Sequence, residues 1–227
     1  MDHFIEIYRS RAADYHRMIT PEDVEGNLLP AIERVAPVAG RRVLDVGTGT
    51  GRLPLLFEAR PAQVVALDLH ADMLREHNRR RGGWSLLQAD ARRLPLPAAG
   101  FGLVTAGWAI GHMVGWYGDE WPVHIGRALA ELHRVAAPGA GLVIMETLGT
   151  GSLSPSPPAE GLAHYYAWLE GEWGFERQEI ATDYQFGSVA EAVAATRFFF
   201  GEELAAQIEA NGWSRLPEWT GVWGKRI

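Results

Sequence analysis

Between residues 41 and 147, runs of apolar and β-branched residues alternate with segments whose apolar positions recur with a helical period. The runs predict strands and the segments predict helices. The predicted strands cover residues 41–46, 63–69, 85–89, 101–106 and 141–147, and the predicted helices cover 51–59, 71–81 and 122–136. Near-continuous apolar strands are typical of a parallel sheet that is covered by helices on both faces. Because crossovers in such sheets are right-handed, the pattern predicts an α/β, doubly wound fold.

Two parts of the chain depart from this alternation. Residues 1–36 predict helices ahead of the sheet, and residues 149–158 are rich in Gly, Ser and Pro, which indicates a break. Beyond the break the pattern predicts, in order, a helix over 160–173, a strand over 178–186, a helical region over 189–211 and a strand over 219–225. The two additional strands complete a seven-stranded sheet.

We therefore expect a single domain over residues 1–227, a length that suits one sizeable core. Its expected parts are an N-terminal helical cap (1–36), a ligand-binding core (41–147), an insertion or lid (149–176) and C-terminal strands with a helix (177–227).

Composition excludes several classes of function. The net charge is −7, and a mildly acidic chain is a poor nucleic-acid binder, because phosphate neutralisation needs clustered Lys and Arg. The absence of cysteine excludes disulfides, thiolate metal sites and cysteine nucleophiles. The N-terminus lacks the pattern of a signal peptide, and no stretch approaches the ~20 apolar residues of a membrane span. We therefore expect a cytoplasmic protein that binds neither nucleic acid nor membrane.

A glycine-rich turn follows the first predicted strand and opens the first predicted helix of the core. Gly47, Gly49 and Gly51 have the spacing G-x-G-x-G. Glycine allows positive φ and a close approach of the backbone to a ligand, and a helix N-terminus adds free N–H groups. The dinucleotide fingerprint is G-x-G-x-x-G, but position 52 is Arg. The turn thus indicates a ligand other than a nicotinamide dinucleotide.

Two aspartates end the next two predicted strands. Asp68 could accept hydrogen bonds from both hydroxyls of a ribose, and the alternative is a helix N-cap. Asp90, together with the N–H of Ala91, could hold an adenine edge, and the alternative is a residue of a loop turn. Ligands of open α/β sheets lie at the carboxyl ends of strands, which favours ligand binding in both cases.

At this point the sequence resembles the class I S-adenosylmethionine-dependent methyltransferases. Residues 43–53, with the sequence VLDVGTGTGRL, resemble their first motif, and residues 66–68 (ALD) resemble their ribose-binding acidic motif. Residues 88–91 (QADA), followed by LPLP, resemble their adenine-binding motif. ELHRV at 131–135, with Pro138, Gly139 and Gly141, resembles the segment before their fifth strand. One departure is Gly102, where an acidic residue is common.

The resemblance implies a Rossmann-like, seven-stranded, mostly parallel sheet whose last strand is antiparallel, with S-adenosyl-L-methionine as the cofactor. It implies methyl transfer to a small molecule. The residues expected to bind the cofactor are Tyr15, Asp45, Gly47, Thr48, Gly49, Asp68, Leu69, Met73, Asp90, Ala91, Gly107 and Trp108.

Trp108 and His112 follow the fourth predicted strand, at its carboxyl end, where donor and acceptor should meet. Trp108 could cover the sulfonium through cation–π attraction, and the alternative is a core aromatic. His112 is the best-placed histidine for a general base, and the alternative is a capping or packing role. His164 and His124 are weaker candidates. No histidine pair has metal-ligand spacing within a helix, so no metal site is expected.

Aromatic residues outside the core motifs leave several alternatives open. Tyr8 and Tyr15, seven apart, are expected on one helical face, where Tyr15 either contacts the ligands or packs the helix down. The aromatics after the break line the acceptor pocket, form a small core under a long connection, or contribute to a homodimer contact. These aromatics are Tyr165, Tyr166, Trp168, Trp173, Phe175 and, further on, Phe198, Phe199 and Phe200.

Two rival functions share parts of this pattern. An NAD(P)-dependent oxidoreductase would have the same strand-turn-helix, but Arg52 replaces the expected glycine, and no Tyr-x-x-x-Lys pair exists because Lys225 is the only lysine. A non-catalytic S-adenosylmethionine-binding protein on the same fold would retain the glycine turn and both aspartates.

Overall fold

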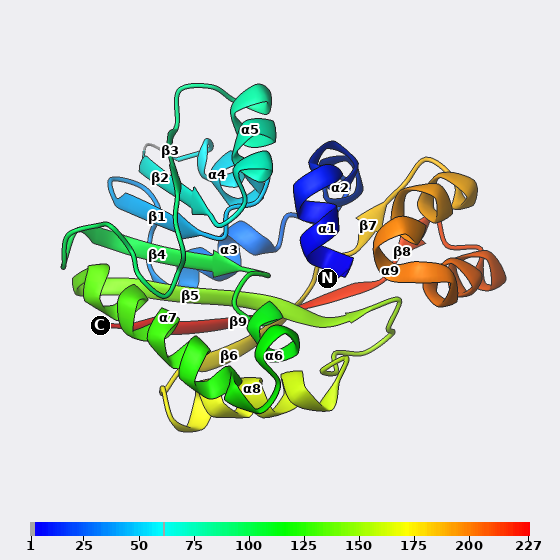
Figure 1. Cartoon of the computed structure of the whole chain (residues 1–227). Coiled ribbons are helices and arrows are strands. Elements are labelled where there is room, and N and C mark those ends of the chain that lie inside the picture. The colour runs from blue at the N-terminus through cyan, green and yellow to red at the C-terminus, as the bar shows by residue number, and fades with distance from the viewer. Residues whose placement is uncertain (1–2, 61) are drawn as a thin grey trace.

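The computed structural model describes residues 3–60 and 62–227. Its main sheet has seven strands in the order β3-β2-β1-β4-β5-β9-β6 (Figure 1). The strands are β1 (Arg42–Val46), β2 (Gln63–Asp68), β3 (Ser85–Gln88), β4 (Phe101–Gly107), β5 (Ala136–Thr150), β6 (Glu176–Ala181) and β9 (Glu218–Arg226). Neighbours from β3 to β5 are parallel, whereas β9 is antiparallel to both β5 and β6. The predicted seven-stranded sheet with an antiparallel last strand is therefore confirmed.

Helices cover both faces of this sheet. One face packs against α6 (His112–Tyr117), α7 (Trp121–Val135) and α8 (Glu160–Gly171), and the buried core there includes Leu44, Leu129 and Trp223. The other face packs against α3 (Leu28–Val35) and α4 (Arg52–Phe57), with Val43 and Phe57 in the core. Adjacent residues of β1 thus point into opposite cores, as the period of a strand requires.

The N-terminal helices lie at the end of the sheet where the parallel strands terminate. Here α1 (His3–Ser10) and α2 (Ala12–Ile19) lie between α5 (Ala71–Arg80) and α9 (Val189–Asn211) (Figure 1). Gly201, with φ of +86°, interrupts α9. The helical cap therefore lies over the carboxyl ends of the strands.

Two local predictions are wrong. The strand predicted over 178–186 is divided: β6 ends at Ala181, and β7 (Tyr184–Gln185) pairs instead with β8 (Arg215–Leu216) in a separate small sheet. Tyr8 and Tyr15 do not share one continuous helix, because Arg11 has non-helical φ and ψ of −128° and 29°. The two tyrosine rings nevertheless meet, with centroids 5.5 Å apart.

Candidate functional site

The glycine turn brings the loops after β1 and β4 into close contact. Gly47 has φ of +69°, and a Cβ there would lie 2.3 Å from the Cβ of Ala109. Gly49 also has positive φ (+56°), a conformation that side chains with a Cβ adopt only with strain. Gly51 has φ of +94°, and its Cα faces the ring of buried His77. Space and backbone conformation therefore both require glycine in this turn.

Asp68 ends β2 and joins the turn to the following loop. Its Oδ2 accepts the N–H of Gly49 at 2.8 Å, and its Oδ1 accepts the N–H of His70 at 2.8 Å. Burial raises the pKa of this carboxyl, and the backbone hydrogen bonds oppose the increase. Each carboxylate oxygen has two lone-pair positions, so both oxygens retain room for a further donor such as a ribose hydroxyl.

Asp45 lies deeper in the same region. Its Oδ1 accepts the hydroxyl of Thr105 at 2.7 Å, and burial raises its pKa to about 7. Among the described residues, the buried Oδ2 of Asp45 and the buried hydroxyl of Thr48 make no close hydrogen bond, although the side chain of Thr48 still lowers the pKa of Asp45. Unsatisfied buried polar atoms are costly, so their presence beside a cavity indicates groups that a ligand completes.

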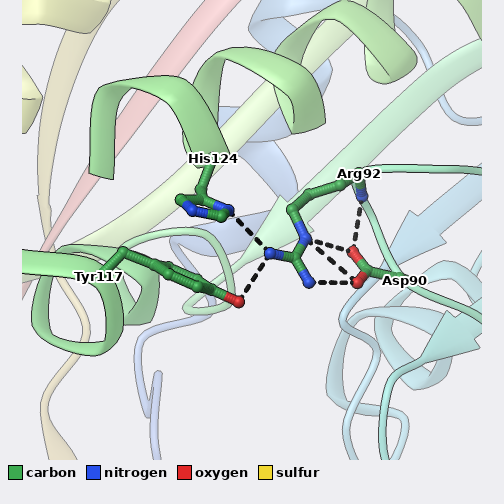
Figure 2. Close-up of polar contacts among 4 residues, drawn as sticks. All are labelled: Asp90, Arg92, Tyr117 and His124. Carbon is green, nitrogen blue, oxygen red and sulfur yellow. Dashed lines mark hydrogen bonds and ion pairs between the residues drawn. The ribbon is translucent and has the colours of Figure 1, made fainter. Parts of the chain in front are cut away.

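Asp90 is held by a network that connects the loop after β3 to α6 and α7 (Figure 2). Nε and Nη2 of Arg92 donate to its carboxylate, and the nearest pair, Nη2 and Oδ2, is 2.6 Å apart. Nη1 of Arg92 contacts the hydroxyl of Tyr117 at 2.6 Å and Nδ1 of His124 at 2.8 Å. The rings of Tyr117 and His124 stack 3.6 Å apart. The guanidinium lowers the pKa of Asp90, so this carboxylate stays an acceptor.

A cavity at the carboxyl ends of β1, β2 and β4 collects these groups. All thirteen residues predicted to form the site line it: His112 and the twelve residues expected to bind the cofactor. Their individual roles stay predictions. His164 does not line this cavity, and His124 reaches the site only through Arg92.

Arg52 is a functional candidate that sequence reasoning missed. Its guanidinium lies 3.9 Å above the ring of Trp108 and 2.7 Å from the carboxylate of Glu22, while Nη2 is buried without a partner among the described residues. Trp108 itself has φ of +50°, a strained conformation that often marks functional sites. In the sequence, Arg52 was notable only because it occupies the position of the third glycine in the dinucleotide-binding fingerprint.

The N-terminal helices close the cavity from above. The hydroxyl of Tyr8 lies 2.8 Å from Nε2 of His112, and Nδ1 of His16 lies 2.9 Å from the hydroxyl of Thr50. Tyr15 lines the cavity beside Gly49, and burial raises its pKa to about 12. Helices α1 and α2 are thus attached to both ligand-facing loops.

A second cavity of about 740 Å³ adjoins the first and shares Tyr8, Tyr15, Arg52, Trp108 and His112 with it. Its other walls come from α1, α2, α6, α8, α9 and the ends of β5 and β9. Glu146 and Glu218 also line it, and burial raises the pKa of each side-chain carboxyl to about 8. Sequence reasoning missed both, because a lone glutamate in an apolar strand shows no recognisable spacing.

The aromatic residues after the break lie in two places, and the core that most of them join is the main core and not the predicted small one. Tyr165, Tyr166 and Phe175 are buried in the main core, and Trp168 and Trp173 pack against it. Phe199 and Phe200 line the second cavity, and Phe198 does not. The second cavity therefore receives aromatic walls from α9 and not from α8.

Residues 3–60 and 62–227 contain no group of three or more His, Asp or Glu side chains arranged to hold a metal ion. None of the helices in this part of the chain combines the length and the apolar character needed to cross a membrane.

The first cavity fits the adenosyl group and amino-acid end of S-adenosylmethionine. Asp68 suits the ribose, and Asp90 suits the exocyclic amine of adenine. The unpartnered Nη2 of Arg52 suits a carboxylate, and Oδ2 of Asp45 suits an ammonium group. A donor or acceptor is thus present for each polar part of the molecule.

Comparison with known proteins supports the same assignment. Residues 44–144 match the family model described as a methyltransferase domain. The demethylmenaquinone methyltransferase of Thermobifida fusca is 32% identical over 191 residues, covering 82% of this chain and 74% of that protein. The malonyl-[acyl-carrier protein] O-methyltransferase of Pseudescherichia vulneris is 32% identical over 175 residues, covering 70% of this chain and 63% of that protein.

The chain spans about half to two thirds of the length of the first malonyl-[acyl-carrier protein] O-methyltransferases that it matches. Among solved structures, an S-adenosylmethionine-dependent methyltransferase from Aquifex aeolicus has the same fold, with a TM-score of 0.57, 18% identity and full coverage of both chains. Fold, cavity and sequence relatives agree, and the NAD(P)-dependent alternative is not supported. The chain belongs to the class I S-adenosylmethionine-dependent methyltransferase family.

Proposed function

We propose that the protein transfers the methyl group of S-adenosylmethionine to a small-molecule acceptor bound in the second cavity. The observation that carries the proposal is the shared wall between the two cavities, formed by residues that include Arg52, Trp108 and His112. A donor in the first cavity would lie beside an acceptor in the second. Orientation of two bound reactants can lower a barrier by roughly 7–11 kcal/mol.

Each part of the first cavity has a stated role in this proposal. Asp68 binds the ribose hydroxyls, Asp90 and the N–H of Ala91 bind the adenine edge, and Asp45 with Nη2 of Arg52 binds the amino-acid end. The methyl donor supplies an activated sulfonium. The ring of Trp108 lies beside it and favours its positive charge.

His112 is proposed as the general base. It lines both cavities, and Tyr8 contacts its Nε2, which fixes the position of the ring. A base that removes a proton from the acceptor contributes typically ~10²–10⁴-fold to the rate. Phe4 and Trp116 pack against the ring and limit its movement, with centroids 5.4 Å away in both cases.

The proposal includes the partners expected from the sequence. The net charge of −7 supports a small-molecule acceptor over a nucleic acid. A cytoplasmic location and a homodimer stay predictions, which cell fractionation and sedimentation of the purified protein test.

Calorimetry tests the proposal at the level of the cofactor. We expect S-adenosylmethionine and S-adenosylhomocysteine to bind with micromolar affinity, and NAD to show no binding at the same concentrations. The opposite preference would overturn the proposal. Release of S-adenosylhomocysteine together with an acceptor that has gained one methyl group would separate an active enzyme from a non-catalytic binding protein.

A further inference from the structure

The second cavity carries an excess of acidic groups. Among the described residues that line it, the carboxylates are Glu22, Glu146, Glu203 and Glu218, whereas Arg52 is the sole guanidinium and His112 the sole histidine. Glu22 already pairs with Arg52 at 2.7 Å. Arg52 also lowers the pKa of Glu218, so the four carboxylates share a single guanidinium among the described residues of this lining.

One oxygen of the Glu218 carboxylate makes no close hydrogen bond among the described residues, although the side chain of Thr150 lies near enough to lower the pKa of the group. The residue is 2% exposed, lies at the start of β9 and pairs with Thr150 of β5. The hydroxyl of Thr147 donates to its Oε1 at 2.9 Å, while the buried Oε2 is the oxygen without a close hydrogen bond in the described part of the chain. Leaving such an atom unpaired costs free energy, which a ligand that donates a hydrogen bond would recover.

Glu146 provides a second buried carboxylate in the same cavity. The residue is 5% exposed, and its Oε1 accepts the N–H of Gly111 at 2.8 Å, immediately before His112. Burial raises the pKa of Glu146 and of Glu218 to about 8, and the charge of Glu22 raises that of Glu218 further. A ligand that brings positive charge would let one of these carboxylates ionise.

The rest of the cavity is suited to the apolar part of such a ligand. Phe199, Phe200 and Leu204 of α9 contribute apolar side chains, and Trp116 contributes an indole. Aromatic faces attract cations as well as apolar groups. An anionic acceptor would lie beside several acidic side chains. The one guanidinium in the described lining that could attract it, that of Arg52, is already paired with Glu22.

We propose that the second cavity binds an amine, with an N–H group on the carboxylate of Glu218 and its apolar body against Phe199 and Phe200. The inference rests on the proposed function, because the amine is the methyl acceptor. It adds the chemical class of that acceptor.

Calorimetry on the protein saturated with S-adenosylhomocysteine tests this class. The probes are two matched series: phenethylamine with 2-phenylethanol and 3-phenylpropanoate, and tryptamine with tryptophol and indole-3-propanoate. We expect the amine of at least one series to bind about tenfold or more tightly than its alcohol and its acid. Equal or tighter binding of the alcohol or acid in both series, or no binding of either amine at millimolar concentration, would overturn the inference.

A Glu218→Gln variant tests the residue. We expect it to weaken amine binding by about tenfold to a hundredfold, because a charge-assisted hydrogen bond is lost, and to leave S-adenosylhomocysteine binding unchanged. Glu202→Gln is the matched control, since Glu202 is exposed and pairs with Arg197 away from the cavity lining. Unchanged amine affinity in Glu218→Gln would overturn the assignment.

A second variant covers the case in which Glu218→Gln does not fold. Glu218→Asp retains the carboxylate but withdraws it by one methylene, so the amine should bind more weakly and still more tightly than its alcohol. Amine affinity equal to that of the unmodified protein would overturn the assignment. Failure of the unmodified protein to bind S-adenosylhomocysteine would contradict the proposed function, whereas binding combined with a preference for acids or alcohols contradicts this inference alone.

Discussion

The hydroxyl of Tyr8 lies 2.8 Å from Nε2 of His112, which joins helix α1 to the first residue of α6. The rings meet edge to face, with centroids 5.5 Å apart. The proposed base is therefore positioned by the N-terminal cap, a segment that lies about one hundred residues away in the sequence.

His112→Ala should lower turnover by ~10²–10⁴-fold and leave the affinity for S-adenosylmethionine unchanged, because the base acts on the acceptor. Tyr8→Phe removes only the hydroxyl and should give a smaller loss. Steady-state kinetics with calorimetry separate the two effects. A near-normal turnover in His112→Ala would show that His112 is not the base, and that the rate depends on alignment of the two reactants alone.

Asp68→Ala should weaken S-adenosylmethionine binding by about one to two orders of magnitude, given ~1.5–3 kcal/mol for a charge-assisted hydrogen bond. The same change removes the acceptor for the N–H of Gly49, so some thermal stability should also be lost. Asp72→Ala is the control, because Asp72 is half-exposed on α5 and pairs with Arg75. An unchanged dissociation constant in Asp68→Ala would remove Asp68 from the site.

Arg92→Lys should weaken S-adenosylmethionine binding by about tenfold, because lysine cannot hold Asp90 through two nitrogens while also reaching Tyr117 and His124. The variant keeps the positive charge, so the expected loss reports on geometry. Arg93→Lys is the control for the neighbouring exposed arginine. If both variants bind the cofactor equally well, the network in Figure 2 does not position the adenine contact.

Gly47→Ala should abolish cofactor binding and destabilise the fold, because the added Cβ would lie 2.3 Å from that of Ala109. Gly40→Ala is a matched control: its φ of +73° resembles that of Gly47, but a Cβ there meets nothing within 4 Å. The control should cost about 1–2 kcal/mol from its backbone conformation alone. Thermal unfolding should therefore rank Gly47→Ala well below Gly40→Ala.

Stability should fall as the pH rises from about 6.5 to 8. Burial raises the pKa of Asp45 to about 7 and those of Glu146 and Glu218 to about 8, so the folded protein keeps protons that the unfolded chain has already lost. Buried His77 makes stability rise with pH, because its pKa is lowered to about 4 in the folded protein. This rise ends near 6.5, the ordinary histidine pKa, so it does not offset the fall expected above that pH.

Glu218→Gln isolates one of these groups. Across the same pH range, denaturant unfolding should show a decrease in the free energy of unfolding that is smaller by about 1–2 kcal/mol than in the unmodified protein. Equal pH dependence in the two proteins would mean that Glu218 is ionised in the folded state at neutral pH.

Periodicity and spacing predicted the parallel strands, the glycine turn and the two strand-ending aspartates, because these depend on local sequence. The antiparallel last strand and the other residues expected to bind the cofactor were implied only by the resemblance to the methyltransferase family. The turn around Gly47 and the strand-ending Asp68 and Asp90 can be recognised from their immediate neighbours. The second cavity could not be predicted in this way. Glu22, Glu146 and Glu218 come from distant parts of the chain, and tertiary packing brings them together.

The division of the 178–186 strand was missed for a related reason. Apolar alternation continues through Tyr184 and Phe186, but the backbone leaves the main sheet after Ala181 and pairs with residues 215–216. Apolar alternation predicts that a segment is a strand, but it does not indicate which distant strand that segment pairs with.

If both ligands bind as proposed, the wall shared by the two cavities would couple their occupancy. Arg52 stacks on Trp108, and both side chains face both cavities, so a ligand that moves either one in the first cavity reshapes the second. Such coupling is reciprocal by thermodynamic necessity: if bound cofactor tightens the acceptor by some factor, the acceptor tightens the cofactor by the same factor. Cooperativity between the two proposed ligands would then act through one stacked pair of side chains.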